Sequence, residues 1–140
     1  MAFTNPTDSA IATILKNTRT IAVVGAGTDR FKPVYGVMSF LIAQGYDVYP
    51  VNPVAAGETV QGKTILSDLG DVPVPIDMVD CFRRSEFIPP IVDRAIEVGA
   101  KTIWMQLGVI NDAAAETARA AGLTVVMDRC PVIEWSRLGL

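Results

Sequence analysis

The sequence predicts an α/β protein with a doubly wound parallel sheet of five strands and helices on both faces. Short β-branched apolar runs alternate along the chain with segments whose apolar residues recur at helical spacing. The first run, Thr20 to Val24, is apolar on both faces, as expected for a central parallel strand. The links between runs and helices are short, which is typical of repeated strand–helix units.

The individual elements follow from these periods and from end signals. Thr7 or Asp8 is expected to cap the first helix and Asn111 the fourth, while Pro33 precedes the second. Glycines end three of the helices. The expected helices span residues 8–17, 34–43, 85–98 and 112–121 and a short segment after Pro131, and the expected strands span 20–24, 47–51, 76–81, 102–105 and 123–127.

The stretch between the second and third strands is expected to be irregular. Residues 55–63 have the composition of a loop, and residues 65–69 that of a short helical turn for which Ser67 is the candidate cap. Pro50 lies inside the second strand, where proline is tolerated off-centre or where no ladder bond is needed. With the strands numbered along the chain, we expect the order 3-2-1-4-5 and a ligand crevice between strands one and four.

Length and composition indicate one globular domain. The chain has 140 residues, half of them hydrophobic and 19% charged. We expect residues 1–18 to supply a helix that packs on a ligand-binding domain of residues 19–140. The net charge of −3 argues weakly against general nucleic-acid binding, although a local cationic pocket remains compatible with an anionic ligand.

The N-terminus, the apolar runs and the two cysteines indicate the cellular compartment of the protein. The N-terminus lacks the basic and apolar segments of a signal peptide, and no apolar run is long enough to span a bilayer. The two cysteines lie far apart and give neither a disulfide framework nor a zinc spacing. A cytoplasmic protein without membrane contact is the simplest expectation.

The loop after the first strand is the strongest local signal for a ligand. Gly25 and Gly27 break the apolar run, Arg30 and Lys32 follow, and Pro33 then starts a helix. Glycine lets the backbone approach a ligand closely, and a helix start offers free N–H groups to a phosphate. The structural alternative is that the glycines only form a turn and that the cations are solvated.

This loop differs from a dinucleotide-binding fingerprint. Arg30 stands where the third glycine is required, and the second strand ends in Val51-Asn52-Pro53 instead of an acidic residue that would hold a ribose. These differences indicate a phosphate-rich ligand other than NAD. NADP stays open, because an arginine near this position accommodates a 2′-phosphate.

The other candidates follow from the position of each strand's end. Parallel strands present their carboxyl ends at one edge of the sheet, so Asn52, Phe82, Arg83 and Gln106 should share that edge with the glycine loop. A flat base could lie against Phe82 or an arginine plane. Arg83 is favoured over Arg84 because it is nearer the strand end. Two alternatives stay open for Tyr35 and Gln106: each either contacts a ligand or serves only the fold.

Catalytic chemistry has little support in the residues. The chain contains no histidine, which removes Ser-His-Asp and Cys-His catalysis and imidazole metal sites. Asp77, Asp80 and Asp128 form no acid–base pair by spacing, and no metal cluster stands out. Cys130 precedes a helix, where thiolate character can rise, but such a thiol without histidine is more often structural. We expect no catalytic centre.

Several ordered blocks resemble the small stand-alone CoA-binding proteins of the YccU-like family, which is similar to the CoA-binding domain of the succinyl-CoA synthetase α subunit. The resemblance covers nearly all of the chain from Arg19 onward and is carried by the runs Ile21–Gly25, Gly45–Pro53, Val79–Glu86, Trp104–Gly108 and Val126–Cys130. It implies a Rossmann-like domain that holds coenzyme A, with the phosphates near the glycine loop and the adenine near Phe82. Gly27 stands where many relatives carry serine. The hydroxyl of Thr28 can make the contact that this serine would make.

By block, the resemblance implies CoA contacts on Gly25 to Lys32, on Val51 to Pro53, on Cys81 to Arg83 and on Gln106 to Gly108. Ligase activity does not carry over, because the synthetase's active histidine lies outside this domain. Together with the residues chosen by position, the candidate CoA-binding residues are Gly25, Ala26, Gly27, Thr28, Arg30, Lys32, Pro33, Tyr35, Val51, Asn52, Pro53, Phe82, Arg83, Gln106 and Gly108.

Three hypotheses follow. The first is a protein that binds coenzyme A or an acyl-CoA without its own catalytic centre and stores, senses or presents it, with a protein partner or a homo-oligomer left open. The second is an NAD(P)-binding enzyme or redox sensor on the same fold. The third, which the residues support least, is an acyltransferase or thioesterase that uses Cys130.

Overall fold

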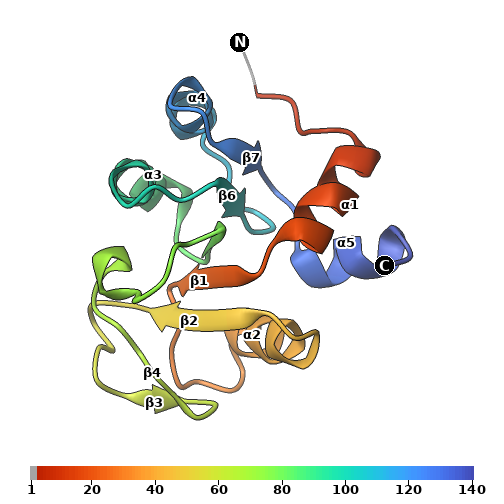
Figure 1. Ribbon diagram of the computed structural model, residues 1–140. Helices are drawn as coiled ribbons and strands as arrows, with labels where there is room; N and C mark the ends of the chain where they lie inside the picture. The colour runs from red at the N-terminus through yellow and green to blue at the C-terminus, as the bar shows by residue number, and fades with distance from the viewer. Residues whose placement is uncertain (1–2) are drawn as a thin grey trace.

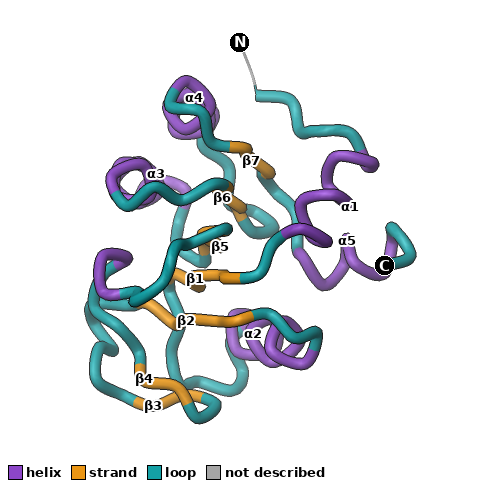
Figure 2. Tube along the Cα trace, viewed as in Figure 1, coloured by secondary structure: helices purple, strands orange, loops and turns teal. Residues whose placement is uncertain are grey.

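The computed structural model describes residues 3–140 and has three layers, with a parallel sheet between two layers of helices (Figures 1 and 2). Helices on both faces of a parallel sheet confirm the predicted fold class. The sheet consists of β1 (Thr20–Val24), β2 (Asp47–Val51), β5 (Met78–Cys81), β6 (Thr102–Met105) and β7 (Thr124–Val126). One face carries α1 (Asp8–Asn17), α2 (Pro33–Ala43) and α5 (Pro131–Arg137), and the other carries α3 (Ile88–Glu97) and α4 (Asp112–Ala120).

The strand order differs from the prediction. The sheet has the order β2-β1-β5-β6-β7, which is 2-1-3-4-5 when its strands are numbered along the chain, so the expected order 3-2-1-4-5 is wrong. β1 pairs with β2 on one side and with β5 on the other. The strand order therefore reverses between β1 and β5, and not between the first and fourth strands.

Burial and one proline give the physical reason for this order. All four residues of β5 are buried, which suits a strand with a neighbour on each side. β2 begins with the exposed Asp47 and contains Pro50, whose ring nitrogen has no hydrogen to donate to a further strand. β2 is accordingly an edge strand of the sheet, whereas the expected order would have placed Pro50 in an interior strand.

Alternate side chains of the strands enter two apolar clusters. Ile21 and Val23 of β1 pack with α1, α2 and α5, whereas Ala22 and Val24 pack with α3 and α4. Both clusters are buried, which explains why the central strands are continuous apolar runs with no polar alternation.

The helix ends agree with their sequence signals. The Thr7 hydroxyl accepts a hydrogen bond from the N–H of Ala10 at 3.2 Å, and the Asn111 side chain accepts one from the N–H of Ala114 at 2.9 Å. Pro33 occupies the first turn of α2. The predicted caps are thus confirmed, because each side chain satisfies an N–H that the helix leaves unpaired.

The segment between β2 and β5 is more ordered than expected. The predicted loop contains an antiparallel hairpin of β3 (Thr59–Val60) and β4 (Lys63–Thr64), and the helical turn lies later than predicted, at η1 (Leu69–Asp71). Asp68 and not Ser67 caps η1. Leu66 forms a parallel bridge with Val51, so the chain before η1 pairs locally with β2 and is not helical. A second short turn, η2 (Ser85–Phe87), precedes α3.

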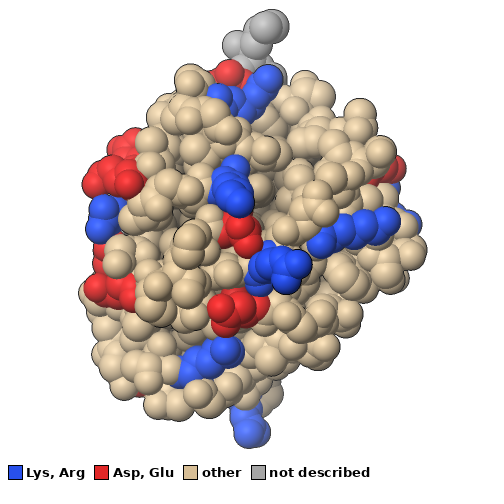
Figure 3. All heavy atoms as spheres, in the orientation of Figure 1, with Lys and Arg blue, Asp and Glu red and all other residues tan. Residues whose placement is uncertain are grey.

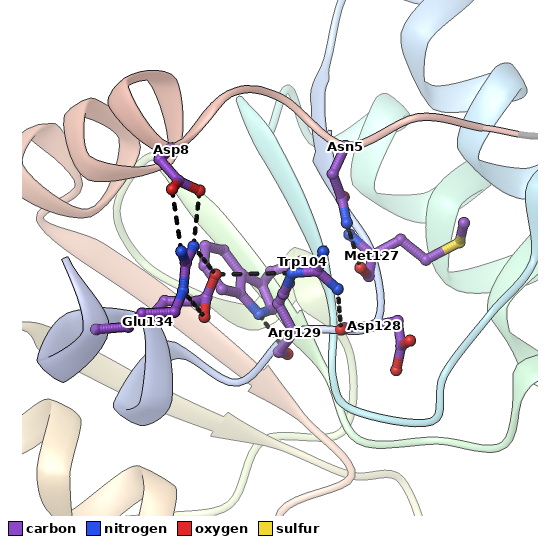
Figure 4. Close-up of polar contacts among 8 residues, drawn as sticks. Asn5, Asp8, Trp104, Met127, Asp128, Arg129 and Glu134 are labelled. Carbon is purple, nitrogen blue, oxygen red and sulfur yellow. Dashed lines mark hydrogen bonds and ion pairs between the residues drawn. The ribbon is translucent and has the colours of Figure 1, made fainter.

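Residues that precede α1 cover the edge of the sheet formed by β7, at the other end of the strand order from β2. The Asn5 side chain donates to the carbonyl of Met127 at 2.8 Å and accepts from its N–H at 2.8 Å, just beyond β7 (Figure 4). Asn5 thereby supplies the pairing that a further strand would supply. α1 follows and buries Ile11 and Leu15 in the cluster that it shares with α2 and α5.

A charged network joins α1 to α5. Arg137 donates to both carboxylate oxygens of Asp8, at 2.8 and 3.0 Å, and to both of Glu134, at 2.9 and 3.1 Å. The Glu134 side chain is only 3% exposed, and Arg129 lies 3.7 Å from it. The network thus places a buried carboxylate between two arginines.

Within residues 3–140, no helix combines the length and the apolar character that a membrane crossing requires.

Candidate functional site

The carboxyl ends of four strands bring the predicted residues together. Val24 is in register with Val51 on one side and with Cys81 on the other, and Cys81 is in register with Met105. The next residue along each strand belongs to the predicted set. The resulting row across one edge of the sheet is Asn52, Gly25, Phe82 and Gln106.

The glycine loop is held tightly at its start. Gly25 has φ of +96° and donates its N–H to the carbonyl of Val51 at 2.9 Å. A Cβ on Gly25 would lie 2.3 Å from the carbonyl oxygen of Phe82, which only glycine avoids. The backbones of β1 and β5 therefore approach each other closely where the strand order reverses.

Asn52 fixes the same loop from β2. Its side-chain amide donates to the carbonyl of Ala26 at 2.9 Å, and its side-chain oxygen accepts the N–H of Val54 at 3.0 Å. The side chain of this predicted ligand residue therefore already positions the backbone of the glycine loop.

The cations after the glycines are available to a ligand. Arg30 and Lys32 are exposed, and within residues 3–140 no carboxylate lies within ion-pair distance of either. Lys32 is the N-cap residue of α2, and its side chain caps no backbone N–H. The positive end of the α2 dipole thus lies beside two exposed cations.

The molecular surface carries mixed charge on the face drawn in Figure 3. On the molecular face shown in Figure 3, basic and acidic side chains are interspersed and form no single positive surface.

Tyr35 lies in the first turn of α2, where the sequence placed it. Its carbonyl accepts a hydrogen bond from the side-chain amide of Gln61 at 3.0 Å, and Gln61 accepts one from the Ser39 hydroxyl at 2.8 Å. The turn of the β3–β4 hairpin is therefore tied to α2. The ring of Tyr35 is half-buried, and its contact with a ligand stays a prediction.

Phe82 and Arg83, the first two residues after β5, contact different parts of the protein. The Phe82 side chain is half-buried against the cluster on the α2 side. The Arg83 guanidinium lies 4.9 Å from the centre of the Phe87 ring, a cation–π contact. Arg84 is much more exposed and lies 4.0 Å from the exposed Glu86. Arg83 is therefore the more ordered of the two arginines at this edge.

Gln106 is buried at the end of β6, and its side-chain oxygen has no hydrogen-bond partner within residues 3–140. Asp80, one position before Cys81 in β5, is fully buried, and neither of its carboxylate oxygens has a partner in the same part of the chain. Burial raises the pKa of Asp80 well above its usual value. Asp80 lies in register with Trp104, two residues before Gln106.

The far end of the edge is ordered by backbone contacts. Gly108 has φ of +78°, and its N–H donates to the Asp128 carboxylate at 2.8 Å. Cys130 is buried at the start of α5, and Cys81 is fully buried, which raises the pKa of its thiol. Neither cysteine forms a disulfide, and residues 3–140 contain no cluster of three His, Cys, Asp or Glu side chains suited to a metal ion.

A cavity of about 170 Å³ opens beside the ends of β1 and β2 on the α3 side. Two predicted residues, Val51 and Pro53, line it. The remaining lining residues were not foreseen from the sequence, because they come from β1, η1 and α3 and converge only in the folded chain. They are Val24, Ser67, Asp68, Leu69, Pro90, Ile91 and Arg94.

Known proteins are similar to this chain over most of its length. A family model described as "CoA binding domain" matches residues 19–136. Protein YneT of Bacillus subtilis strain 168 is 34% identical over 126 residues, which cover 90% of this chain and 92% of YneT. A solved structure described as a hypothetical protein from Pyrococcus horikoshii OT3 is 38% identical with a TM-score of 0.91, and the match covers all of both chains.

A longer relative contains the same domain. The α subunit of acetate–CoA ligase [ADP-forming] I from Pyrococcus furiosus is 25% identical over 126 residues, which cover 80% of this chain but only 27% of that subunit. The family expected from the sequence is confirmed by the match over residues 19–136. The chain belongs to the CoA binding domain family, whose fold it shares, and is related to the CoA-binding part of ADP-forming acetate–CoA ligase.

Proposed function

We propose that this protein binds coenzyme A or an acyl-CoA at the carboxyl edge of its sheet and has no catalytic centre of its own. The observation that supports this most is the glycine loop, which Asn52 and the Val51 carbonyl hold next to two exposed cations, Arg30 and Lys32. Membership of the CoA binding domain family supports the same ligand. The protein would hold the cofactor for a partner or in reserve.

The phosphates of the ligand are assigned to the glycine loop. Gly25 and Gly27 leave the backbone free of side chains, and a Cβ on Gly27 would meet no atom within 4 Å, so the loop is open to a ligand there. Arg30 and Lys32 supply charge beside the start of α2. The pantetheine arm would then extend along the edge towards Phe82, Arg83, Gln106 and Gly108.

Calorimetric titration with coenzyme A tests this proposal. We expect saturable binding, and we expect Arg30→Ala to weaken it by about threefold to tenfold at low salt and to reduce its salt dependence, because exposed ion contacts are screened. Dephospho-CoA, which lacks the 3′-phosphate, should bind more weakly than coenzyme A.

Lys16→Ala is the matched control, since Lys16 is an exposed cation at the end of α1. Its affinity for coenzyme A should equal that of the unmodified protein. Absence of saturable binding at millimolar coenzyme A, or tighter binding of NAD(P) than of coenzyme A, would contradict the proposal.

A further inference from the structure

Cys130 lies at the same edge of the sheet as the glycine loop, and the ligand contacts proposed above do not include it. It follows the end of β7 and directly precedes α5. The residue is 7% exposed, and its side chain belongs to the cluster that contains Trp104 and Val126. The thiol therefore lies just below the surface, on the α5 side of the sheet.

Contacts on both preceding residues fix the backbone that presents Cys130. Asp128 has φ of +58°, a conformation that few residues other than glycine adopt, and its carboxylate accepts the N–H of Gly108 at 2.8 Å. The carbonyl of Arg129 accepts the indole N–H of Trp104 at 2.9 Å (Figure 4). Cys130 is thus held beside the ends of β6 and β7.

Two buried polar side chains face the same side of the sheet. Asp80 is in register with Val23 and Trp104, which both belong to the cluster on the α5 side. The N–H of Gln106 continues the ladder to β5, so by alternation its side chain faces the same way as that of Trp104.

The acceptors of these two side chains lack donors. Asp80 is fully buried and Gln106 is 7% exposed. Within residues 3–140, the two carboxylate oxygens of Asp80 and the side-chain oxygen of Gln106 receive no hydrogen bond. Buried polar atoms are normally satisfied, so these atoms indicate that a donor binds between the end of β6 and α5.

The ligand proposed above carries suitable donors. The pantetheine arm of coenzyme A contains amide N–H groups and ends in a thiol. The proposed function directs this arm along the edge towards Gln106 and Gly108, and Gly108 holds Asp128, two residues before Cys130. The thiol at the end of the arm would therefore lie within reach of the Cys130 thiol.

Cys130 has no second cysteine with which to form an internal disulfide. Cys81, the only other cysteine of the chain, is fully buried in the cluster on the opposite side of the sheet. The two thiols are free. A mixed disulfide at Cys130 would therefore persist until an external thiol reduces it, because no thiol of the chain can displace the bound group.

We propose that Cys130 exchanges with CoA disulfide, a small-molecule disulfide, and retains one coenzyme A as a mixed disulfide. The proposal rests on the proposed function and adds a redox control to the same site. The Cys130 thiolate attacks one sulfur, the sulfur–sulfur bond of CoA disulfide breaks, and the second coenzyme A leaves as a thiolate that takes up the proton lost by Cys130. Cys130 is oxidised and the departing coenzyme A is reduced, so no further oxidant takes part.

Intact-mass spectrometry of the unmodified protein tests this step. After incubation with CoA disulfide at neutral pH, we expect the mass of a single attached coenzyme A, which dithiothreitol removes. Glutathione disulfide has the same reactive bond but no nucleotide. It should react more slowly by about tenfold or more, because only a bound disulfide is held against the buried thiol. Equal rates for the two disulfides, or no adduct with CoA disulfide, would overturn the proposal.

Peptide mapping of the unmodified protein and two variants locate the adduct. Cys130→Ser should form none, whereas Cys81→Ser is the matched control and should react at the rate of the unmodified protein. An excess of desulfo-CoA, which fills the site without a thiol, should slow the reaction of the unmodified protein. An adduct on Cys81, or a rate that desulfo-CoA leaves unchanged, would contradict exchange at the bound position.

The two proposals fail in different ways. If the unmodified protein binds no coenzyme A in calorimetry, the proposed function is wrong. If it binds coenzyme A but CoA disulfide modifies Cys130 no faster than glutathione disulfide does, only the covalent retention is wrong. Should Cys130→Ser fail to fold, peptide mapping of the unmodified protein still decides the outcome.

Discussion

Gly25 lies where the backbones of β1 and β5 come close together, and this approach is possible because glycine has no side chain. A methyl group there would meet the Phe82 carbonyl at 2.3 Å, and φ of +96° is unfavourable for other residues. We expect Gly25→Ala to lower the free energy of unfolding by about 2 kcal/mol or more. Gly27→Ala has open space around its Cβ and should cost under about 1 kcal/mol; equal losses in urea denaturation would contradict this account.

Because of Asp80, we expect the free energy of unfolding to fall as pH rises, which is the reverse of the usual effect of an aspartate. Its pKa in the folded protein is raised by burial, whereas an unfolded aspartate has a pKa of about 3.9. Below that value both states are protonated and the stability contribution is fully present. As pH rises, the unfolded chain loses the proton first, so stability falls by about 1.4 kcal/mol per unit until the folded pKa is reached.

Asp80→Asn should therefore gain stability relative to the unmodified protein as pH rises from 4 to 7, measured by urea denaturation at each pH. Asp77→Asn is the opposite case. Burial raises the pKa of Asp77, but N–H groups of Thr20 and Arg19 and the ammonium of Lys101 outweigh burial and lower it. Asp77→Asn should thus lose relative stability as pH rises towards the unfolded pKa of about 3.9, with little further change from pH 5 to 7. A flat difference curve for Asp80→Asn would show that Asp80 ionises normally in the folded state.

At the scale of elements, the contact between α1 and α5 depends on a buried carboxylate. Arg137→Gln would leave Glu134, 3% exposed, with Arg129 at 3.7 Å as its remaining cation. We expect Arg137→Gln to lower the free energy of unfolding clearly more than the loss of an exposed ion pair would, because a buried carboxylate with fewer partners is costly.

Arg84→Gln is the control for Arg137→Gln. Both members of its ion pair with Glu86 are exposed, so the loss in the same denaturation experiment should be under about 0.5 kcal/mol. A similar small loss for Arg137→Gln would mean that Arg129 alone compensates Glu134.

The elements themselves were largely predictable, and the exceptions share a cause. Helix ends followed Thr7, Pro33 and Asn111, whose effects are local. The β3–β4 hairpin was missed because its pairs, such as Thr59 with Thr64, lie in a short polar stretch without alternation. Its turn is held by Gln61, whose partners are Tyr35 and Ser39 on α2, a contact that no local pattern reveals.

At the scale of the whole molecule, the strand order sets which loops adjoin the glycine loop. β5 lies next to β1, so Phe82 directly abuts Gly25, whereas the expected order would have placed Gln106 there. Pro50 carried a usable signal for this arrangement, since proline is best accommodated in an edge strand. The topological switch point lies between β1 and β5.

The sequence by itself determined the fold class, the positions of most helices and strands, and the gathering of candidate residues at one edge. These features depend on local periodicity and on the common direction of parallel strands, which holds in any strand order. Only the tertiary structure decided the neighbours of β1, the isolated burial of Asp80 and the cavity between β2, η1 and α3. Each of these depends on packing between residues far apart in the chain, which local patterns do not encode.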